Sequence, residues 1–236
     1  MEKIYTGSQT EFYAAVDDML QEERRRHIVT ANPETLMLGQ RNPALDRVLC
    51  ASETIIVPDG IGIVKALRSL NKPTQGRIPG VELAAHLIEQ CGRAGKRIYL
   101  YGAKQEIVQR LADQIRASHG AETVCGFRNG YGQDDDEVFA EIAALQPDLV
   151  LVALGIPRQE LAIHDHLAQF QKGIFIGVGG SFDVLSGSKK RAPTLFIKFN
   201  LEWLYRILKE PKRLKRFYDS NIRFLGMVKK LKAKGS

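Results

Sequence analysis

A carboxylate at the end of an apolar run is the first candidate for chemistry in this 236-residue chain. Asp59 follows the apolar run at residues 54–57 and stands beside Gly60 and Gly62. A carboxylate in such a place can accept a proton from a bound substrate. It can equally cap the helix that follows, which is a common role for Asp. The residues alone leave both roles open.

Two other polar groups stand in comparable places. Thr30 and Asn32 end a second apolar run, and their hydroxyl and amide groups suit the hydroxyls of a sugar. The alternative is that they cap a helix beginning near Glu34. Arg77 shortly precedes the helix predicted at residues 81–92. It can bind a phosphate with the help of the helix N-terminus, or it can be a surface arginine in a loop.

A glycine-rich turn at residues 177–183 follows a later apolar run. Backbone N–H groups in such a turn can approach a diphosphate closely. Gly179, Gly180 and Asp183 are therefore candidate substrate-binding residues. The segment is not a dinucleotide fingerprint, because its glycine spacing differs and no ribose-binding acid follows it.

The acidic run Asp134-Asp135-Asp136 resembles the motif with which some glycosyltransferases hold a divalent ion. Here it begins an amphipathic helix, where acids interact favourably with the helix dipole. The five histidines lack the spacing of metal ligands, and no Walker loop, GxSxG or HExxH motif is present. We therefore assign no metal ligand and expect no cofactor.

The elements that position these residues follow from the apolar pattern. Six short runs have the composition of buried parallel strands, at residues 27–30, 54–57, 97–101, 122–125, 149–154 and 174–178. Amphipathic stretches lie between them, at residues 34–51, 62–70, 81–92, 104–118, 135–145 and 159–171. This alternation predicts an α/β fold, a Rossmann-like sheet of mostly parallel strands with helices on both faces. Ligands of such folds bind beyond the carboxyl ends of the strands.

The net charge of +7 is unevenly distributed. Residues 189–236 hold 15 Lys and Arg against three acids, a net of +12, so residues 1–188 carry a net of −5. Such an asymmetry indicates a polyanionic partner, either an anionic lipid surface or a nucleic acid. No helix-turn-helix, RRM or KH signature is present, so we expect no nucleic acid.

The basic segment includes a predicted amphipathic helix at residues 211–231. Its apolar and aromatic side chains share about half of the circumference, and most of its cations share the other half. This pattern is typical of a helix that lies in a membrane interface. The alternative is a helix packed on the core or on another subunit, and a homo-oligomer stays open. No run is long enough to span a bilayer and no export signal is seen. We expect a cytoplasmic protein, peripheral on the inner face of a bacterial plasma membrane.

Several linked segments together resemble one known family. They are Asn32-Pro33, Asp59-Gly60, Arg77-Ile78-Pro79-Gly80, Pro157-Arg158-Gln159-Glu160, residues 177–183, Gly187, Arg191-Ala192-Pro193 and Leu201-Glu202-Trp203-Leu204-Tyr205-Arg206. In this order, and over nearly the whole chain, they closely resemble the WecG/TagA/CpsF family of bacterial glycosyltransferases.

The resemblance implies an inverting transfer of N-acetylmannosamine from a UDP donor to undecaprenyl-diphosphate-linked N-acetylglucosamine, without a tightly bound metal. The products of the family feed teichoic acid, enterobacterial common antigen or capsule-like polymers. By resemblance, Asp59 is the general base, and Thr30, Asn32, Arg77 and Gln159 are pocket residues. Without a metal, the departing diphosphate needs cations and N–H donors, for which the glycine turn, Arg191 and Arg206 are candidates.

The resemblance also implies a division of the chain. Residues 1–193 form the catalytic body, and residues 194–236 form a basic helical appendage that associates with the membrane and completes the active site. Transfer of the uronic acid of N-acetylmannosamine, or of another hexose from its UDP donor, is an alternative within the same class. A basic-tailed, non-catalytic protein that binds nucleotides or nucleic acid is the alternative from another class.

Overall fold

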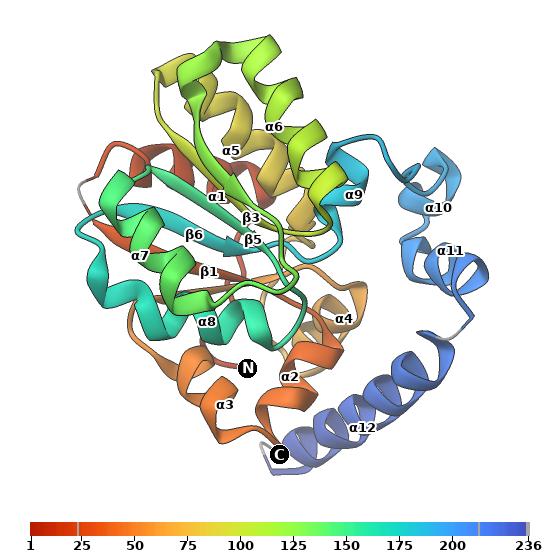
Figure 1. The fold of residues 1–236 in the computed structure, drawn as a ribbon. Helices are drawn as coiled ribbons and strands as arrows, with labels where there is room; N and C mark the ends of the chain where they lie inside the picture. The colour runs from red at the N-terminus through yellow and green to blue at the C-terminus, as the bar shows by residue number, and fades with distance from the viewer. Residues whose placement is uncertain (23, 212, 235–236) are drawn as a thin grey trace.

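The computed structural model describes residues 1–22, 24–211 and 213–234, with side chains described for all of these except residues 206, 213, 216 and 234. Its centre is one six-stranded sheet in the order β2-β1-β6-β5-β3-β4, and every pair of neighbours is parallel. Helices cover both faces of this sheet (Figure 1). The strands are β1 Arg25–Ala31, β2 Thr54–Pro58, β3 Ile98–Gly102, β4 Val124–Arg128, β5 Leu149–Ala153 and β6 Gly173–Gly177. The predicted α/β fold is confirmed.

Strand β1 lies between two other strands, so the carboxyl ends of these three strands lie side by side. It pairs with β2 on one side, where Ala31 lies opposite Pro58, and with β6 on the other, where Val29 lies opposite Gly177. The chain visits β2 next to β1 and then crosses to the far half of the sheet before it returns in β6. The loops after β1, β2 and β6 therefore open at one edge, at a switch in strand order.

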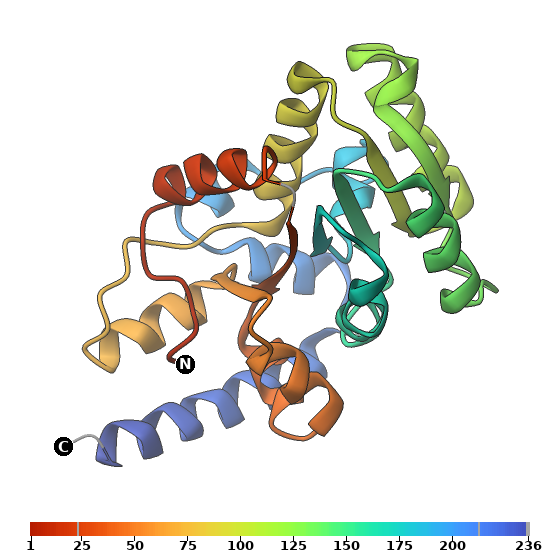
Figure 2. The same ribbon diagram turned by 90° about the vertical axis from the view of Figure 1, so that its left-hand side faces the viewer.

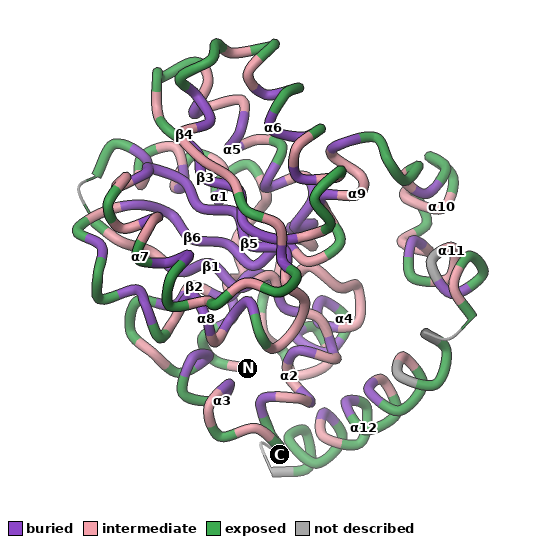
Figure 3. The backbone as a smooth tube through the Cα atoms, viewed as in Figure 1, coloured by how far each residue is buried: buried purple, intermediate pink, exposed green. Residues whose placement is uncertain are grey.

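The two faces of the sheet are covered by different helices. One face packs against α1 Gln9–Met19, α5 Gly80–Ala94, α6 Gln105–His119 and α9 Ser181–Leu185. The other packs against α2 Pro33–Gly39, α3 Pro43–Cys50, α4 Ile61–Ser69, α7 Asp135–Leu145 and α8 Arg158–His166. Successive strand residues supply the two cores, as Ile28 and Val29 show by joining opposite clusters. Figure 3 shows the inner strands β3, β5 and β6 as continuously buried.

Some helices differ from the pattern-based expectation. The single helix expected at residues 34–51 is wrong, because the chain breaks between α2 and α3. Pro43 has no N–H to continue a helix, and Asn42 caps α3 by accepting from the backbone N–H of Ala44 at 3.0 Å and of Leu45 at 3.2 Å. Helix α8 is shorter than expected and is followed by the 3-10 turn η2 Leu167–Gln169. The turn η1 Ala121–Thr123 replaces the start of the fourth expected strand.

Three helices follow the body, α10 Thr194–Lys198, α11 Glu202–Lys209 and α12 Arg213–Lys234. Helix α12 runs alongside α2 and α4 (Figures 1 and 2). Phe224 and Val228 of α12 are buried in the same cluster as Val29 of β1 and Met37 of α2. The packed-helix alternative is therefore present in the structure. Among the described residues no helix is long and apolar enough to cross a bilayer.

Candidate active site

Asp59 lies where β2, β1 and the start of α5 meet. Its backbone N–H donates to the carbonyl oxygen of Ala31 at 2.9 Å, which fixes the loop against β1. Its Oδ1 accepts from the N–H of Gly80, the first residue of α5, at 3.1 Å. The N-cap of the helix that follows is Gly60 rather than Asp59. The carboxylate is thus held at the N-terminus of α5.

Thr30 lies on the other side of Gly80. A Cβ added at Gly80 would be 3.1 Å from both Oγ1 and Cγ2 of Thr30, so a larger residue there would force the start of α5 or Thr30 to shift. The Thr30 hydroxyl also donates to the carbonyl oxygen of Gly177 at 3.3 Å, across the β1–β6 pair. Thr30 therefore connects the Asp59 loop to the glycine turn.

Asn32 caps α2, as the alternative allowed. Its Oδ1 accepts from the N–H groups of Glu34 at 2.8 Å and Thr35 at 3.1 Å. It also lies next to the Asp59 loop, because a Cβ added at Gly60 would be 3.2 Å from the Asn32 Cβ. Asn32 is thus both a cap and a neighbour of the carboxylate.

Gln159 is hydrogen-bonded to two turns. Its side chain is buried, and Oε1 accepts from the N–H groups of Gly155 at 3.1 Å and Gly179 at 3.0 Å. These bonds tie the turn after β5 to the turn after β6. The Gly179 N–H is therefore directed to Gln159 rather than outward, while Gly180 is exposed and has open space where a side chain would be.

Glu160 is a member of this group that the sequence reasoning did not assign. Its Oε1 accepts from the Gln159 amide nitrogen at 2.7 Å, which fixes which end of that amide faces the two turns. The residue is only 2% exposed, and its Oε2 has no hydrogen-bond partner among the described residues. Burial raises the pKa of Glu160 to about 7. Its position next to Gln159 was the only signal in the sequence.

Arg77 and Arg191 lie close together and share a carboxylate. Nη1 of Arg77 contacts Oε2 of Glu202 at 2.6 Å, and Nε of Arg191 contacts Oε1 of the same residue at 3.3 Å. Arg191 also forms an ion pair with Glu82, in the first turn of α5. Burial alone raises the pKa of Glu82, but hydrogen bonds from Arg191 and Gln9 outweigh it and lower that pKa overall. The sequence reasoning gave no role to Glu82 or Glu202.

The remaining candidates lie further out or beyond what can be described. Asp183, in α9, pairs with Lys189 at 3.3 Å. The side chain of Arg206 lies outside the described residues, so its predicted contact with the diphosphate stays a prediction.

In the described part of the chain, each of the three acids Asp134, Asp135 and Asp136 contacts groups of the protein itself. Asp134 caps α7, Asp135 pairs with Arg158 at 2.8 Å, and Asp136 contacts His166 at 2.9 Å. No group of three or more His, Cys, Asp or Glu side chains there could hold a metal ion.

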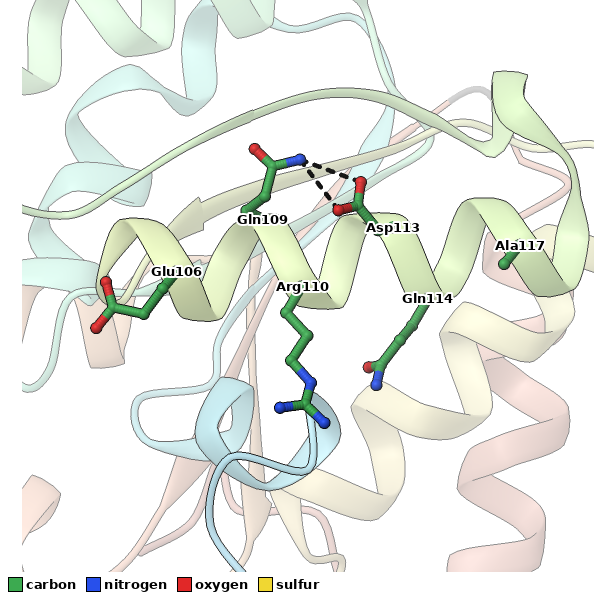
Figure 4. Close-up of a pocket in the computed structure, with 6 residues that line it drawn as sticks. All are labelled: Glu106, Gln109, Arg110, Asp113, Gln114 and Ala117. Atoms are coloured by element: carbon green, nitrogen blue, oxygen red, sulfur yellow. Dashed lines mark hydrogen bonds between the residues drawn. The ribbon is translucent and has the colours of Figure 1, made fainter.

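Two hollows lie away from this cluster. One, of about 550 Å³, is lined by α6 alone, from Glu106 to Ala117 (Figure 4). The other, of about 590 Å³, lies between α2 and α12 and includes Arg41, Arg223 and Lys230. None of the predicted site residues lines either hollow. The candidate active site is therefore the strand-end cluster around Asp59, built mainly from loops.

This cluster can be compared with known proteins. The sequence profile described as "Glycosyl transferase WecG/TagA/CpsF family" matches residues 3–236. The chain belongs to this family. The resemblance inferred from the motifs is thus confirmed, and the family makes the protein a glycosyltransferase.

Relatives of the family cover most of the chain. A protein of Bacillus spizizenii is 40% identical over 197 residues, which are 84% of this chain and 76% of the relative. One of Bacillus subtilis is 41% identical over 189 residues, 80% of this chain and 73% of the relative. One of Staphylococcus aureus is 36% identical over 208 residues, which are 88% of this chain and 81% of the relative. Each of the three is named N-acetylglucosaminyldiphosphoundecaprenol N-acetyl-beta-D-mannosaminyltransferase.

Proposed function

We propose that this protein transfers N-acetylmannosamine from a UDP donor to N-acetylglucosamine on undecaprenyl diphosphate, with inversion at the anomeric carbon. The names of the three relatives supply the substrates. The observation that carries the proposal is the convergence of Asp59, Thr30 and the glycine turn at adjacent strand ends. A sugar and its leaving diphosphate require such a combination of base, hydroxyl and N–H groups.

Asp59 acts as the general base in this proposal. The acceptor hydroxyl gives its proton to the carboxylate while its oxygen attacks the anomeric carbon, and the bond from that carbon to the UDP oxygen breaks on the opposite side. The hydrogen bond from Gly80 fixes the direction of the carboxylate. Positioned general bases contribute about 10² to 10⁴ in rate. Thr30 and Asn32 contact the sugar hydroxyls.

The departing UDP carries the charge that must be stabilised. Arg77 and Arg191 supply two guanidinium groups on the α5 side of Asp59. Gly180, at the exposed end of the turn, allows the diphosphate to approach the backbone closely. Gln159 acts beneath this turn by fixing its shape, and Arg206 is a further cation on α11.

The acceptor lipid requires that the enzyme work at a membrane surface. Helix α12 has an exposed stripe, Leu214, Tyr218, Ile222 and Leu225, whose spacing of four, four and three residues places them on one face. Lys229 and Lys232 continue that face. Such a face inserts its apolar groups among the acyl chains and its cations among anionic headgroups. We propose peripheral binding to the cytoplasmic leaflet through this stripe.

A donor screen tests the proposed transfer. The protein is given a short-chain lipid-diphosphate-N-acetylglucosamine acceptor and one UDP sugar at a time, and products are read by mass spectrometry. We expect product with UDP-N-acetylmannosamine and little with its epimer UDP-N-acetylglucosamine. Product only from the uronic acid donor or from another UDP-hexose would overturn the assignment of the sugar. Absence of product from every donor would overturn the transferase assignment for this chain.

A further inference from the structure

A buried carboxylate connects the C-terminal helices to the candidate active site. Glu202, the first residue of α11, is 8% exposed and forms ion pairs with both Arg77 and Arg191. Each of its oxygens faces a different arginine, at 2.6 Å for Arg77 and 3.3 Å for Arg191. The two arginines come from parts of the sequence 114 residues apart, and Glu202 brings their guanidinium groups to one place.

The arginines are rigidly connected to Asp59 through a six-residue segment, residues 77–82. Within it, the Ile78 N–H donates to the Pro58 carbonyl oxygen at 2.7 Å, and the Gly80 N–H donates to Asp59. Glu82 closes the segment by pairing with Arg191. The same short stretch therefore orients the carboxylate on one side and anchors both arginines on the other.

The charges in this cluster balance, and this explains how two cations can lie together. Arg77 and Arg191 contribute two positive charges, while Glu82 and Glu202 contribute two negative charges. A guanidinium group has five N–H donors. Arg77 directs Nη1 to Glu202, and Arg191 directs Nε to Glu202 and Nη2 to Glu82. Each arginine thus has further N–H groups with which to reach an anionic ligand.

We propose that Glu202 is a positioning residue for the UDP-sugar donor, because it holds Arg77 and Arg191 side by side where both can contact the diphosphate. This inference rests on the proposed function for the identity of the donor. Arginine side chains lose rotamer entropy when they are fixed. With Glu202 in place, that ordering precedes donor binding, so less of the interaction with the diphosphate is lost to it.

A competing role for the same carboxylate predicts the opposite sign. If Glu202 occupied the arginines in place of a phosphate, its removal would strengthen binding of UDP. If it positions them, its removal weakens binding of UDP. If it serves only to attach α11, its removal lowers the melting temperature and leaves UDP affinity unchanged. One set of variants separates these three cases.

The experiment compares Glu202→Ala and Glu202→Gln with the matched control Glu210→Gln. Glu210 directly follows α11 and pairs with the exposed Lys189, whereas Glu202 pairs with Arg77 and Arg191. UDP affinity is measured by calorimetry, and kcat and KM are measured with UDP-N-acetylmannosamine and a soluble acceptor. We expect Glu202→Ala to weaken UDP binding and raise the donor KM by tenfold or more, with kcat changed less than threefold. Glu202→Gln, which preserves shape and one acceptor oxygen, falls between Glu202→Ala and wild type.

A double variant tests whether Glu202 acts through Arg77. In an Arg77→Ala background, Glu202→Ala has much less further effect on UDP affinity, because one of the arginines it orients is already gone. Additive effects of the two changes, or wild-type UDP affinity in Glu202→Ala, would overturn the inference. Tighter UDP binding in Glu202→Ala would also overturn it, in favour of competition.

The proposed function and this inference fail in different ways. Wild-type protein that transfers the sugar, together with Glu202 variants of unchanged UDP affinity, refutes the positioning role alone. Wild-type protein that makes no product with any UDP sugar, while Glu202→Ala weakens UDP binding, refutes the transfer and supports the positioning of a UDP site. Melting temperatures of all variants show whether each is folded when its affinity is measured.

Discussion

The body and the C-terminal helices place their apolar residues in opposite ways. Among the described residues, ten large apolar side chains are exposed, and nine of them lie at residue 195 or later. The exception is Tyr131. A body whose apolar side chains are nearly all buried needs no further partner to cover them, whereas α10–α12 present a concentrated apolar surface. The difference shows that, apart from the stripe of Phe224 and Val228 that packs on the body, the C-terminal helices carry most of the exposed apolar surface among the described residues.

Helix α12 contains this contrast within itself. Phe224 is 1% exposed and packs on the body, while its neighbour Leu225 is 60% exposed. The buried stripe of Phe224 and Val228 attaches the helix, and the exposed stripe of Leu214, Tyr218, Ile222 and Leu225 faces away. Packing, one of the two alternatives that the sequence left open for this helix, is present on one face, and the interfacial binding that we propose uses the other.

The largest expected effect is on kcat and concerns the proposed base in the body. Asp59→Asn removes the proposed base and is expected to lower kcat by about 10² to 10⁴ with a soluble acceptor, while UDP affinity changes little. Asp46→Asn is the matched control, because Asp46 is exposed on α3. Full turnover by Asp59→Asn would show that the base is another group.

The second effect tests the two faces of α12. Phe224→Ala is expected to lower the free energy of unfolding by about 3 to 5 kcal/mol, because it leaves a cavity among Val29, Met37 and their neighbours. Leu225→Ala is expected to change it by about 0.5 kcal/mol or less, because that side chain is already in solvent. Chemical denaturation of both variants measures the difference. Equal losses would mean that α12 packs in another orientation.

The third effect concerns pH and the buried acid of the body. The pKa of Glu160 is about 7 in the folded chain and near 4.5 when unfolded. The folded state therefore holds its proton more tightly. The resulting stabilisation is complete below about pH 4.5 and is lost as pH rises through about 7.

Denaturation between pH 4.5 and 8 measures this effect. Wild type should lose on the order of 1 to 3 kcal/mol over this window relative to Glu160→Gln, which cannot ionise. Parallel curves for the two proteins would show that Glu160 does not titrate in this range.

The smallest expected effect tests the outward surface. Replacing Tyr218 and Leu225 together by Gln is expected to reduce binding to vesicles of mixed anionic and zwitterionic lipid by about tenfold. Turnover with a soluble acceptor and the melting temperature should stay close to wild type, because both side chains are exposed. Sedimentation with the vesicles gives the affinity, and a DNA gel shift at the same salt serves as the control. Unchanged sedimentation would leave the stripe without a role at the membrane.

The sequence predicted the inner strands well because they are largely buried and read as continuous apolar runs, whereas β4, at the sheet edge, is mostly half-buried and begins later than expected. Helix α1 was not predicted, since only Phe12 and Val16 of its residues are buried. A signal was nevertheless present, because Ser8 and Glu11 have the spacing of a capping box and form one in the structure. Pro43 carried the signal for the break between α2 and α3, which the amphipathic pattern concealed.

The site was predictable only in part for a related reason. Asp59, Thr30 and Arg77 follow or flank strands and helix starts, so their types and places indicated function. Glu202 contacts residues that the sequence does not show to be its neighbours, and the burial of Glu160 beside Gln159 is likewise seen only in the folded chain. The Glu202 carboxylate meets an arginine 125 positions earlier, and only the folded arrangement shows this. Long-range ion pairs of this kind leave no periodic pattern in the sequence, so they cannot be predicted from it.

The cluster that contains Phe224 also contains Ile4, near the start of the chain, and Val29 of β1. During synthesis, the first strand is therefore made more than 190 residues before Phe224, whose side chain covers this part of the cluster. Until Phe224 and Val228 arrive, the outer surfaces of α2 and α4 are exposed to other proteins in the cell. A nascent chain stalled before that point would be a natural client for chaperones that bind apolar surface.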